Sequence, residues 1–145
     1  MTMHRRMEEN LPRFSGFTSQ EIDLAREYFT EHYNEEINIE EYALSRHVSA
    51  SWFNKNFKKV AGTTPMKYIL STRIRNTQIL LETTDYNISN IASMVGYENA
   101  FYFSRLFKKE KGLSLAAYRN IFRFLTCLPM VLGEYGRGLP FLSFF

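Results

Sequence analysis

The sequence predicts an all-α fold, in which two helix-turn-helix subdomains are joined by a long linker helix, with about seven helices in all. Three observations indicate this fold class. Apolar residues recur at helical spacing along most of the chain, and no segment has a convincing strand pattern. An apolar frame containing Phe-Lys-Lys occurs twice, about fifty residues apart. Capping residues and glycines stand at the ends of the apolar segments.

The repeat indicates that one small module was built twice. The first copy consists of Ile39, Ala43, Val48, Phe53, Phe57, Lys58, Lys59, Gly62, Thr64 and Tyr68. The second copy consists of Ile88, Ala92, Tyr97, Phe103, Phe107, Lys108, Lys109, Gly112, Ser114 and Tyr118. The offset is 49 residues up to Val48 and Tyr97, and 50 residues from Phe53 and Phe103 onward. One extra residue therefore stands near Asn99, at the start of a helix in the second copy.

The first helix is expected over about residues 19–33. Thr18 and Glu21 have the spacing of a capping box, in which hydroxyl and carboxylate satisfy backbone amides reciprocally. The apolar residues at helical spacing are Ile22, Ala25, Phe29 and Tyr33. After this helix, Asn38 is expected to cap a short one that holds Ile39, Tyr42, Ala43 and Leu44.

The third helix is expected over about residues 50–61, capped by Ser49 and ended by Gly62. Its inward-facing residues are predicted to be Phe53, Phe57 and Val60. Thr64 and Pro65 then read as a cap followed by proline at the first helical position. From there the linker helix is expected to run to about Glu82.

The second unit repeats this plan. Asn87 caps a short helix with Ile88, Ile91, Ala92 and Val95. Gly96 turns the chain into a helix over about residues 99–111 that buries Phe103 and Phe107. Gly112 ends it, and a last helix begins near Ser114.

Composition excludes several functional classes. The three histidines are scattered without partners at metal-ligand spacing, so no metal site or cofactor is expected. No phosphate-cradling glycine loop or nucleophile elbow is present, which argues against an enzyme. The single cysteine, Cys127, fits a reducing compartment, and the N-terminus has no secretion signal. A cytoplasmic protein is expected.

Charge is divided unevenly along the chain. Residues 1–41 contain ten acids and four bases, whereas residues 42–125 contain thirteen bases and four acids. A basic body suggests a polyanion partner. The charge distribution alone is equally explained if the basic residues form a solvent-exposed face that binds no partner.

The second copy resembles a known family. The residues concerned are Ile88, Ile91, Ala92, Val95, Gly96, Tyr97, Tyr102, Phe103, Ser104, Arg105, Leu106, Phe107, Lys108, Lys109, Gly112, Leu113, Ser114, Tyr118 and Arg119. With them the chain resembles the DNA-binding domain of AraC/XylS-type transcription regulators, over about residues 18–119. The resemblance implies two helix-turn-helix units on one rigid linker helix, binding duplex DNA at promoters and usually activating transcription.

The resemblance gives the expected domain organisation. The segments are a linker or remnant at 1–17, a first unit at 18–63, a linker helix at 64–82, a second unit at 83–119 and an atypical apolar tail at 120–145. Leu115 stands where the family usually has proline, which we expect to cost little. Residues 1–17 are too short for the separate sensor domain that such regulators commonly have, so no small-molecule ligand is expected within this chain.

The tail matches nothing in the family. Its apolar run is too short to span a bilayer and is interrupted by Pro129, so no membrane association is expected. Two interpretations stay open: an accidental C-terminus, or a segment that packs on the body or on a partner.

The second helix of each unit is expected to enter the major groove. Correspondence with the family implies that Ser51, Asn54 and Lys55 contact bases in the first unit. In the second unit the residues expected to contact bases lie on the side of the helix opposite Phe103 and Phe107, and they are Ala100, Phe101, Ser104 and Arg105. Asn pairs bidentately with adenine, Lys and Arg donate to guanine, and apolar groups contact the thymine methyl. Phosphate contact is an alternative for Arg105. For Trp52 on the flank, packing is preferred over a base or sugar contact.

The residues expected to contact phosphates are Lys58, Lys59, Thr64, Lys108, Lys109 and Ser114. For the four lysines the alternative role is stabilisation of their own helices, because a positive charge near the C-terminus interacts favourably with the helix dipole. The predicted function is a sequence-specific activator that reads two successive major-groove turns, with RNA polymerase as a further partner. The alternative is a truncated regulator that acts as a helical protein-interaction module.

Overall fold

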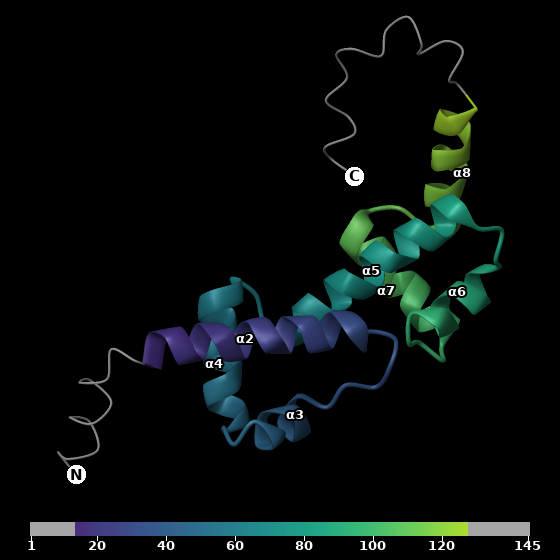
Figure 1. Cartoon of the computed structure of the whole chain (residues 1–145). Coiled ribbons are helices and arrows are strands. Elements are labelled where there is room, and N and C mark those ends of the chain that lie inside the picture. The colour runs from purple at the N-terminus through teal and green to yellow at the C-terminus, as the bar shows by residue number, and fades with distance from the viewer. Residues whose placement is uncertain (1–13, 128–145) are drawn as a thin grey trace, which may run out of the picture. The chain divides into compact units, whose positions relative to one another are not determined.

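The computed structural model describes residues 14–127, and the regular structure within that range is entirely helical (Figure 1). Its helices are α2 (Phe14–Glu31), α3 (Ile39–Ser45), α4 (Ala50–Ala61), α5 (Pro65–Thr83), α6 (Ile88–Met94), α7 (Ala100–Lys111) and α8 (Leu115–Thr126). These seven helices confirm the predicted fold class. The chain divides into two compact units between Arg75 and Asn76, inside α5.

Aromatic rings form the core of the first unit. Phe29 of α2 lies 6.2 Å from Phe53 and 5.8 Å from Phe57, both on α4, measured between ring centroids. Phe57 in turn lies 5.7 Å from Tyr68 of α5. Phe29, Phe53 and Phe57 are at most 2% exposed, so this core holds α2, α4 and the start of α5 together.

The second unit repeats this arrangement with α6, α7 and α8. Phe103 and Phe107 of α7 are fully buried, as predicted. Tyr97 stacks on Phe103 with centroids 4.5 Å apart, and Phe107 meets Tyr118 of α8 edge-on at 5.9 Å. The spacing of four residues between the phenylalanines places both rings on one buried stripe of α7.

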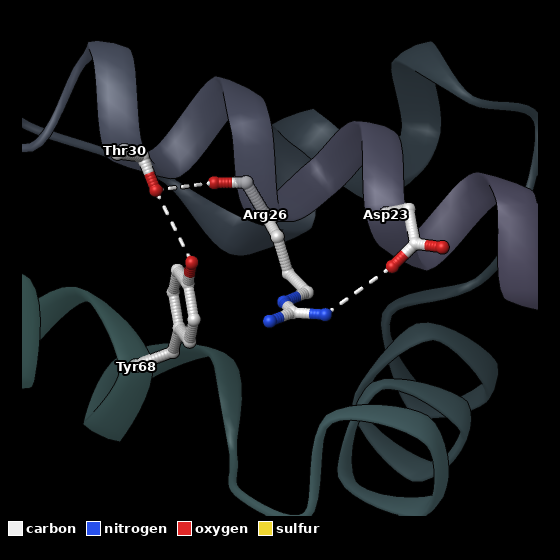
Figure 2. A network of polar contacts seen from close by, with 4 residues as sticks. All are labelled: Asp23, Arg26, Thr30 and Tyr68. Carbon is white, nitrogen blue, oxygen red and sulfur yellow. Dashed lines mark hydrogen bonds and ion pairs between the residues drawn. The ribbon is translucent and has the colours of Figure 1, made fainter.

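Corresponding tyrosines fix the last helix of each unit to its first. In the first unit, the Thr30 hydroxyl donates to the Arg26 carbonyl at 2.7 Å (Figure 2). Because that hydroxyl has one proton, the Tyr68 hydroxyl must donate to Thr30 Oγ1, 3.1 Å away. In the second unit, Tyr118 donates to Glu82 at 2.6 Å and accepts from Gln78 at 2.9 Å. The helix α5 therefore closes the first unit and opens the second.

Four predicted caps are confirmed: side-chain oxygens of Asn38, Ser49, Thr64 and Asn87 accept backbone N–H bonds at the starts of α3 to α6. The structure adds Asn99 and Ser114, which cap α7 and α8 in the same way. Gly62 and Gly112 end α4 and α7 in the left-handed conformation, with φ of 75° and 74°. These local signals set the helix boundaries.

The capping-box prediction at the first helix is wrong. Helix α2 begins at Phe14 and ends at Glu31, so Thr18 lies inside it. The Glu21 carboxylate is held instead by the Arg46 guanidinium, through two hydrogen bonds of 2.8 Å. This pair ties the end of α3 to α2.

The inward orientation predicted for Val60 is also wrong, because its side chain is exposed. Phe53 and Phe57 fill the inner face of α4, and the half-buried Ala61 continues their stripe. Leu44 belongs to α3 as expected, but it too faces outward. The expectations for residues 1–13 and 128–145 lie outside the described residues.

Candidate nucleic-acid interface

A short turn positions the second helix of each helix-turn-helix. In the first unit, His47 has φ of 60° and the amide of Val48 donates to the Ala43 carbonyl at 3.1 Å. In the second unit, Gly96 has φ of 91° and the amide of Tyr97 donates to the Ala92 carbonyl at 2.9 Å. In both turns the preceding helix ends at a residue in the left-handed conformation, and a backbone hydrogen bond joins an amide to the carbonyl five residues earlier.

After this shared turn the two units differ by one residue. Val48 is followed directly by Ser49, the cap of α4, whereas Glu98 stands between Tyr97 and Asn99, the cap of α7. The inserted residue predicted from the repeat is therefore in the connection immediately before α7.

Helix α4 presents polar side chains at its second, fifth and sixth positions. These residues are Ser51, Asn54 and Lys55, and all three are exposed. Asn54 donates one amide proton to the Ala50 carbonyl at 2.9 Å. Its amide nitrogen has a second proton, so it can still act as a donor toward an adenine.

Helix α7 presents Phe101, Ser104 and Arg105 at the same three positions. Phe101 and Arg105 are exposed, with Phe101 at 75%. Ser104 is half-buried and donates to the Ala100 carbonyl at 2.7 Å, the counterpart of the Asn54 bond. Ala100 is half-buried at the first position. The predicted base-reading residues thus occupy matching registers on two helices of twelve residues each.

The predicted phosphate-binding lysines form one pair in the last turn of each helix. Lys58 and Lys59 occupy the last turn of α4, Lys108 and Lys109 the last turn of α7, and all four are exposed. A position in the last turn suits both phosphate contact and interaction with the helix dipole. The structure leaves both roles available.

The two hydroxyl residues predicted to contact phosphate serve as helix caps. Thr64 Oγ1 accepts from the Lys67 amide at 3.3 Å, and Ser114 Oγ accepts from the Ala117 amide at 3.1 Å. A hydroxyl that accepts one amide leaves other amides of the first turn for an anion.

One exposed aromatic residue was missed by the sequence interpretation. Tyr102 stands beside Phe101 and is 56% exposed, whereas its counterpart Trp52 is half-buried against the core of the first unit. The packing preferred for Trp52 agrees with this position. The repeat, whose two copies are offset by 50 residues here, pairs Tyr102 with Trp52 and could have drawn attention to it. The repeat alone does not tell which of the two rings faces solvent.

Two features are absent from the described range. Between residues 14 and 127 there is no group of three or more His, Cys, Asp or Glu residues arranged to hold a metal ion. Likewise, none of the helices described here is long and apolar enough to cross a bilayer.

Two helix-turn-helix units in one chain, each exposing the start of its second helix and lysines at its end, define a DNA-binding domain of the double helix-turn-helix class. A family model described as a helix-turn-helix domain matches residues 42–121. The chain belongs to the AraC-type helix-turn-helix family of transcription regulators.

Individual relatives agree with this assignment. The MmsAB operon regulatory protein of Pseudomonas aeruginosa is 33% identical over 102 residues, which are 70% of this chain and 33% of that protein. The C-terminal domain of AraT, a response regulator from Geobacillus stearothermophilus, has 29% identity and a TM-score of 0.67, covering 70% of this chain and 84% of that one. The DNA-binding domain of AdpA, solved in complex with a target DNA, has 27% identity and a TM-score of 0.66, covering 70% and 92%.

The chain thus spans about a third of the length of the first of these relatives. The matched residues of this chain correspond to one part of that regulator and not to its whole length.

Proposed function

We propose that this chain is a sequence-specific DNA-binding transcription regulator, and an activator, whose helices α4 and α7 read two successive turns of the major groove. The observation that supports this proposal best is the matched register of exposed residues. Ser51, Asn54 and Lys55 on α4 correspond to Phe101, Ser104 and Arg105 on α7. Recognition helices contact base edges with their N-terminal residues, where these groups lie.

The two helices offer different chemistry to DNA. Helix α4 has an amide and an ammonium group, which recognise adenine and guanine edges. Helix α7 has one guanidinium, together with an exposed phenylalanine ring that suits a thymine methyl. A single chain with two unlike readers would recognise a site without two-fold symmetry.

Substitution of Arg105 tests base reading. Arg105→Ala should weaken binding to a site selected from random DNA by about 1–3 kcal/mol, because a bidentate pair with guanine is lost. Binding to unrelated duplex DNA should change much less. Electrophoretic or fluorescence titration at one fixed salt concentration measures both affinities.

The matched control is Lys111→Ala, which removes another exposed cation from the same helix outside the predicted site. It should affect specific and unrelated DNA equally. Equal losses on both DNAs for Arg105→Ala would show that Arg105 contacts phosphate instead of a base.

A helical protein-interaction module is the rival function. It predicts no DNA binding, or DNA binding that is insensitive to salt. The contact with RNA polymerase that activation requires also belongs to the proposal. It is tested by transcription from a promoter carrying the selected site, with and without the protein.

A further inference from the structure

Tyr102 is a large exposed side chain on α7 that has no role in the base reading proposed above. It stands at the third position of the helix and is 56% exposed. Its backbone amide donates to the cap Asn99 at 2.9 Å, but its hydroxyl makes no hydrogen bond to any residue between 14 and 127. The hydroxyl can therefore donate its proton to a partner molecule.

The ring of Tyr102 is supported on one side by the turn of the helix-turn-helix. Tyr97 lies 6.2 Å from Tyr102 between ring centroids and stacks on the buried Phe103 at 4.5 Å. In the first unit the matching positions hold Val48 and Trp52, and Trp52 is half-buried against the core. The second unit thus exposes a ring that a neighbour already orients, which lowers the entropy lost when the ring makes a contact.

Tyr102 shares one flank of α7 with two cations. Arg105 follows it by three residues and Lys109 by seven, and both are exposed. Seven residues return a helix to within about 20° of its starting direction, so Tyr102 and Lys109 project from the same side. A DNA strand contacted by Lys109 would run along the side from which Tyr102 projects.

The chemistry of a phenol suits the DNA backbone better than a base edge. Tyrosine hydroxyls donate to phosphate oxygens, whereas the side chains that read bases bidentately offer two polar atoms. We propose that the Tyr102 hydroxyl donates to a phosphate oxygen on the strand that Lys109 also contacts, and so positions α7 for base reading by Arg105. This inference rests on the proposed DNA-binding function.

A hydroxyl contact has a signature that a lysine contact lacks. A lysine that neutralises a phosphate releases a counterion, and each such contact steepens the dependence of affinity on salt by about one unit of slope. A neutral hydroxyl releases no counterion. Loss of the Tyr102 hydroxyl should therefore lower affinity by the same factor at every salt concentration.

Tyr102→Phe tests this, because it removes the hydroxyl and keeps the ring beside Tyr97. Binding to the selected site and to unrelated duplex DNA should weaken about tenfold, as for loss of a hydrogen bond to a charged group, with the salt slope unchanged. Lys109→Ala should instead reduce the slope by about one. The control Tyr86→Phe removes a hydroxyl of similar exposure, 48%, outside α7 and should leave binding unchanged.

Neutral phosphates in the DNA locate the contact. A methylphosphonate, in which a methyl group replaces one charged oxygen, is placed at one phosphate of the selected site at a time. At one position it should weaken binding of the parent protein but cause little further loss in Tyr102→Phe, because both changes remove the same interaction.

Three results would overturn the inference. They are equal affinities of the parent and Tyr102→Phe, a loss confined to the selected site, which would make Tyr102 a base contact, and losses that add at every methylphosphonate position. Any of them in a parent protein whose DNA binding falls steeply with salt would reject this inference alone. A parent protein that binds no duplex DNA would reject the proposed function together with it.

Discussion

His47 and Gly96 hold the same position in the two turns but differ in backbone strain. Both have positive φ, at 60° and 91°, and only glycine adopts this region without a steric penalty. His47→Gly should therefore raise the free energy of unfolding by up to about 1 kcal/mol. Gly96→Ala should lower it by about 1 kcal/mol or more. Urea denaturation followed by circular dichroism measures both changes.

The exposed turn residue Glu98 provides the control, since Glu98→Ala should change stability by less than about 0.5 kcal/mol. A His47→Gly protein no more stable than the parent would mean that the side chain of His47 makes contacts that offset the strain.

Tyr118 gives the second unit a dependence on alkaline pH. Burial, with the hydrogen bond to Glu82, raises the pKa of Tyr118 to about 12. An unfolded tyrosine has a pKa of about 10, so the native state keeps this proton at a pH where the unfolded state has lost it. Stability contributed by Tyr118 should therefore be complete below pH ~10 and should fall as pH rises toward ~12.

Tyr118→Phe should flatten this alkaline decline, as measured by urea denaturation at several pH values. The same substitution should also lower stability near neutral pH, because the buried Gln78 loses its acceptor. Tyr86→Phe, at an exposed tyrosine, should leave the alkaline decline unchanged. An equally steep decline in the Tyr118→Phe protein would place its origin in another group.

At the scale of the element, two serines at the start of α4 have different expected roles: Ser49 stabilises the helix, and Ser51 is expected to contact DNA. Ser49 caps the helix by accepting from the Trp52 amide at 3.1 Å, while Ser51 points to solvent from the first turn. Ser49→Ala should cost about 1 kcal/mol of stability, because a helix-end amide loses its partner. Ser51→Ala should change stability by less than about 0.5 kcal/mol and should weaken only specific DNA binding.

Thermal denaturation and DNA titration of the two variants measure these effects side by side. If Ser51→Ala destabilised the protein as much as Ser49→Ala, its role would be structural and its assignment to base contact would fail.

The two units also correspond in an arginine on the last helix, which binds the chain just after the first helix of the same unit. Arg73 of α5 donates to the carbonyls of Tyr33 and Glu35, at 2.6 and 2.8 Å, just after α2. Fifty residues later, Arg123 of α8 pairs with Asp85, just after α5. The duplication thus extends from the apolar frame to the polar contacts that hold the last helix of each unit.

At the scale of the whole molecule, the lysine pairs predict a strong dependence of DNA binding on salt. If Lys58, Lys59, Lys108 and Lys109 all contact phosphates, the logarithm of affinity should fall with the logarithm of salt concentration with a slope of about −4. Affinity should then drop about a hundredfold between 50 and 200 mM salt. Titration at several salt concentrations gives the slope.

Replacing one of these lysines should reduce the slope by about one and weaken specific and unrelated DNA equally. An unchanged slope would assign that lysine to the helix dipole. A slope near zero in the parent protein would favour the interaction module over a DNA-binding regulator.

The sequence by itself determined the order of the helices, the caps Asn38, Ser49, Thr64 and Asn87, and the buried phenylalanines of α4 and α7. These features are local: a cap such as Ser49 acts within one turn, and Phe103 and Phe107 share a stripe because they are four residues apart. The repeat also located the extra residue before α7. The face of α4 that holds the predicted base-reading residues followed from the same periodicity.

Only the tertiary structure decided which polar and apolar groups find partners far along the chain. Glu21 pairs with Arg46, 25 residues away, instead of closing a capping box, and Val60 stays exposed because the phenylalanines already fill the inner face of α4. Tyr118 meets Gln78 across 40 residues. Such contacts depend on how helices pack, which residue spacing within a single helix does not specify.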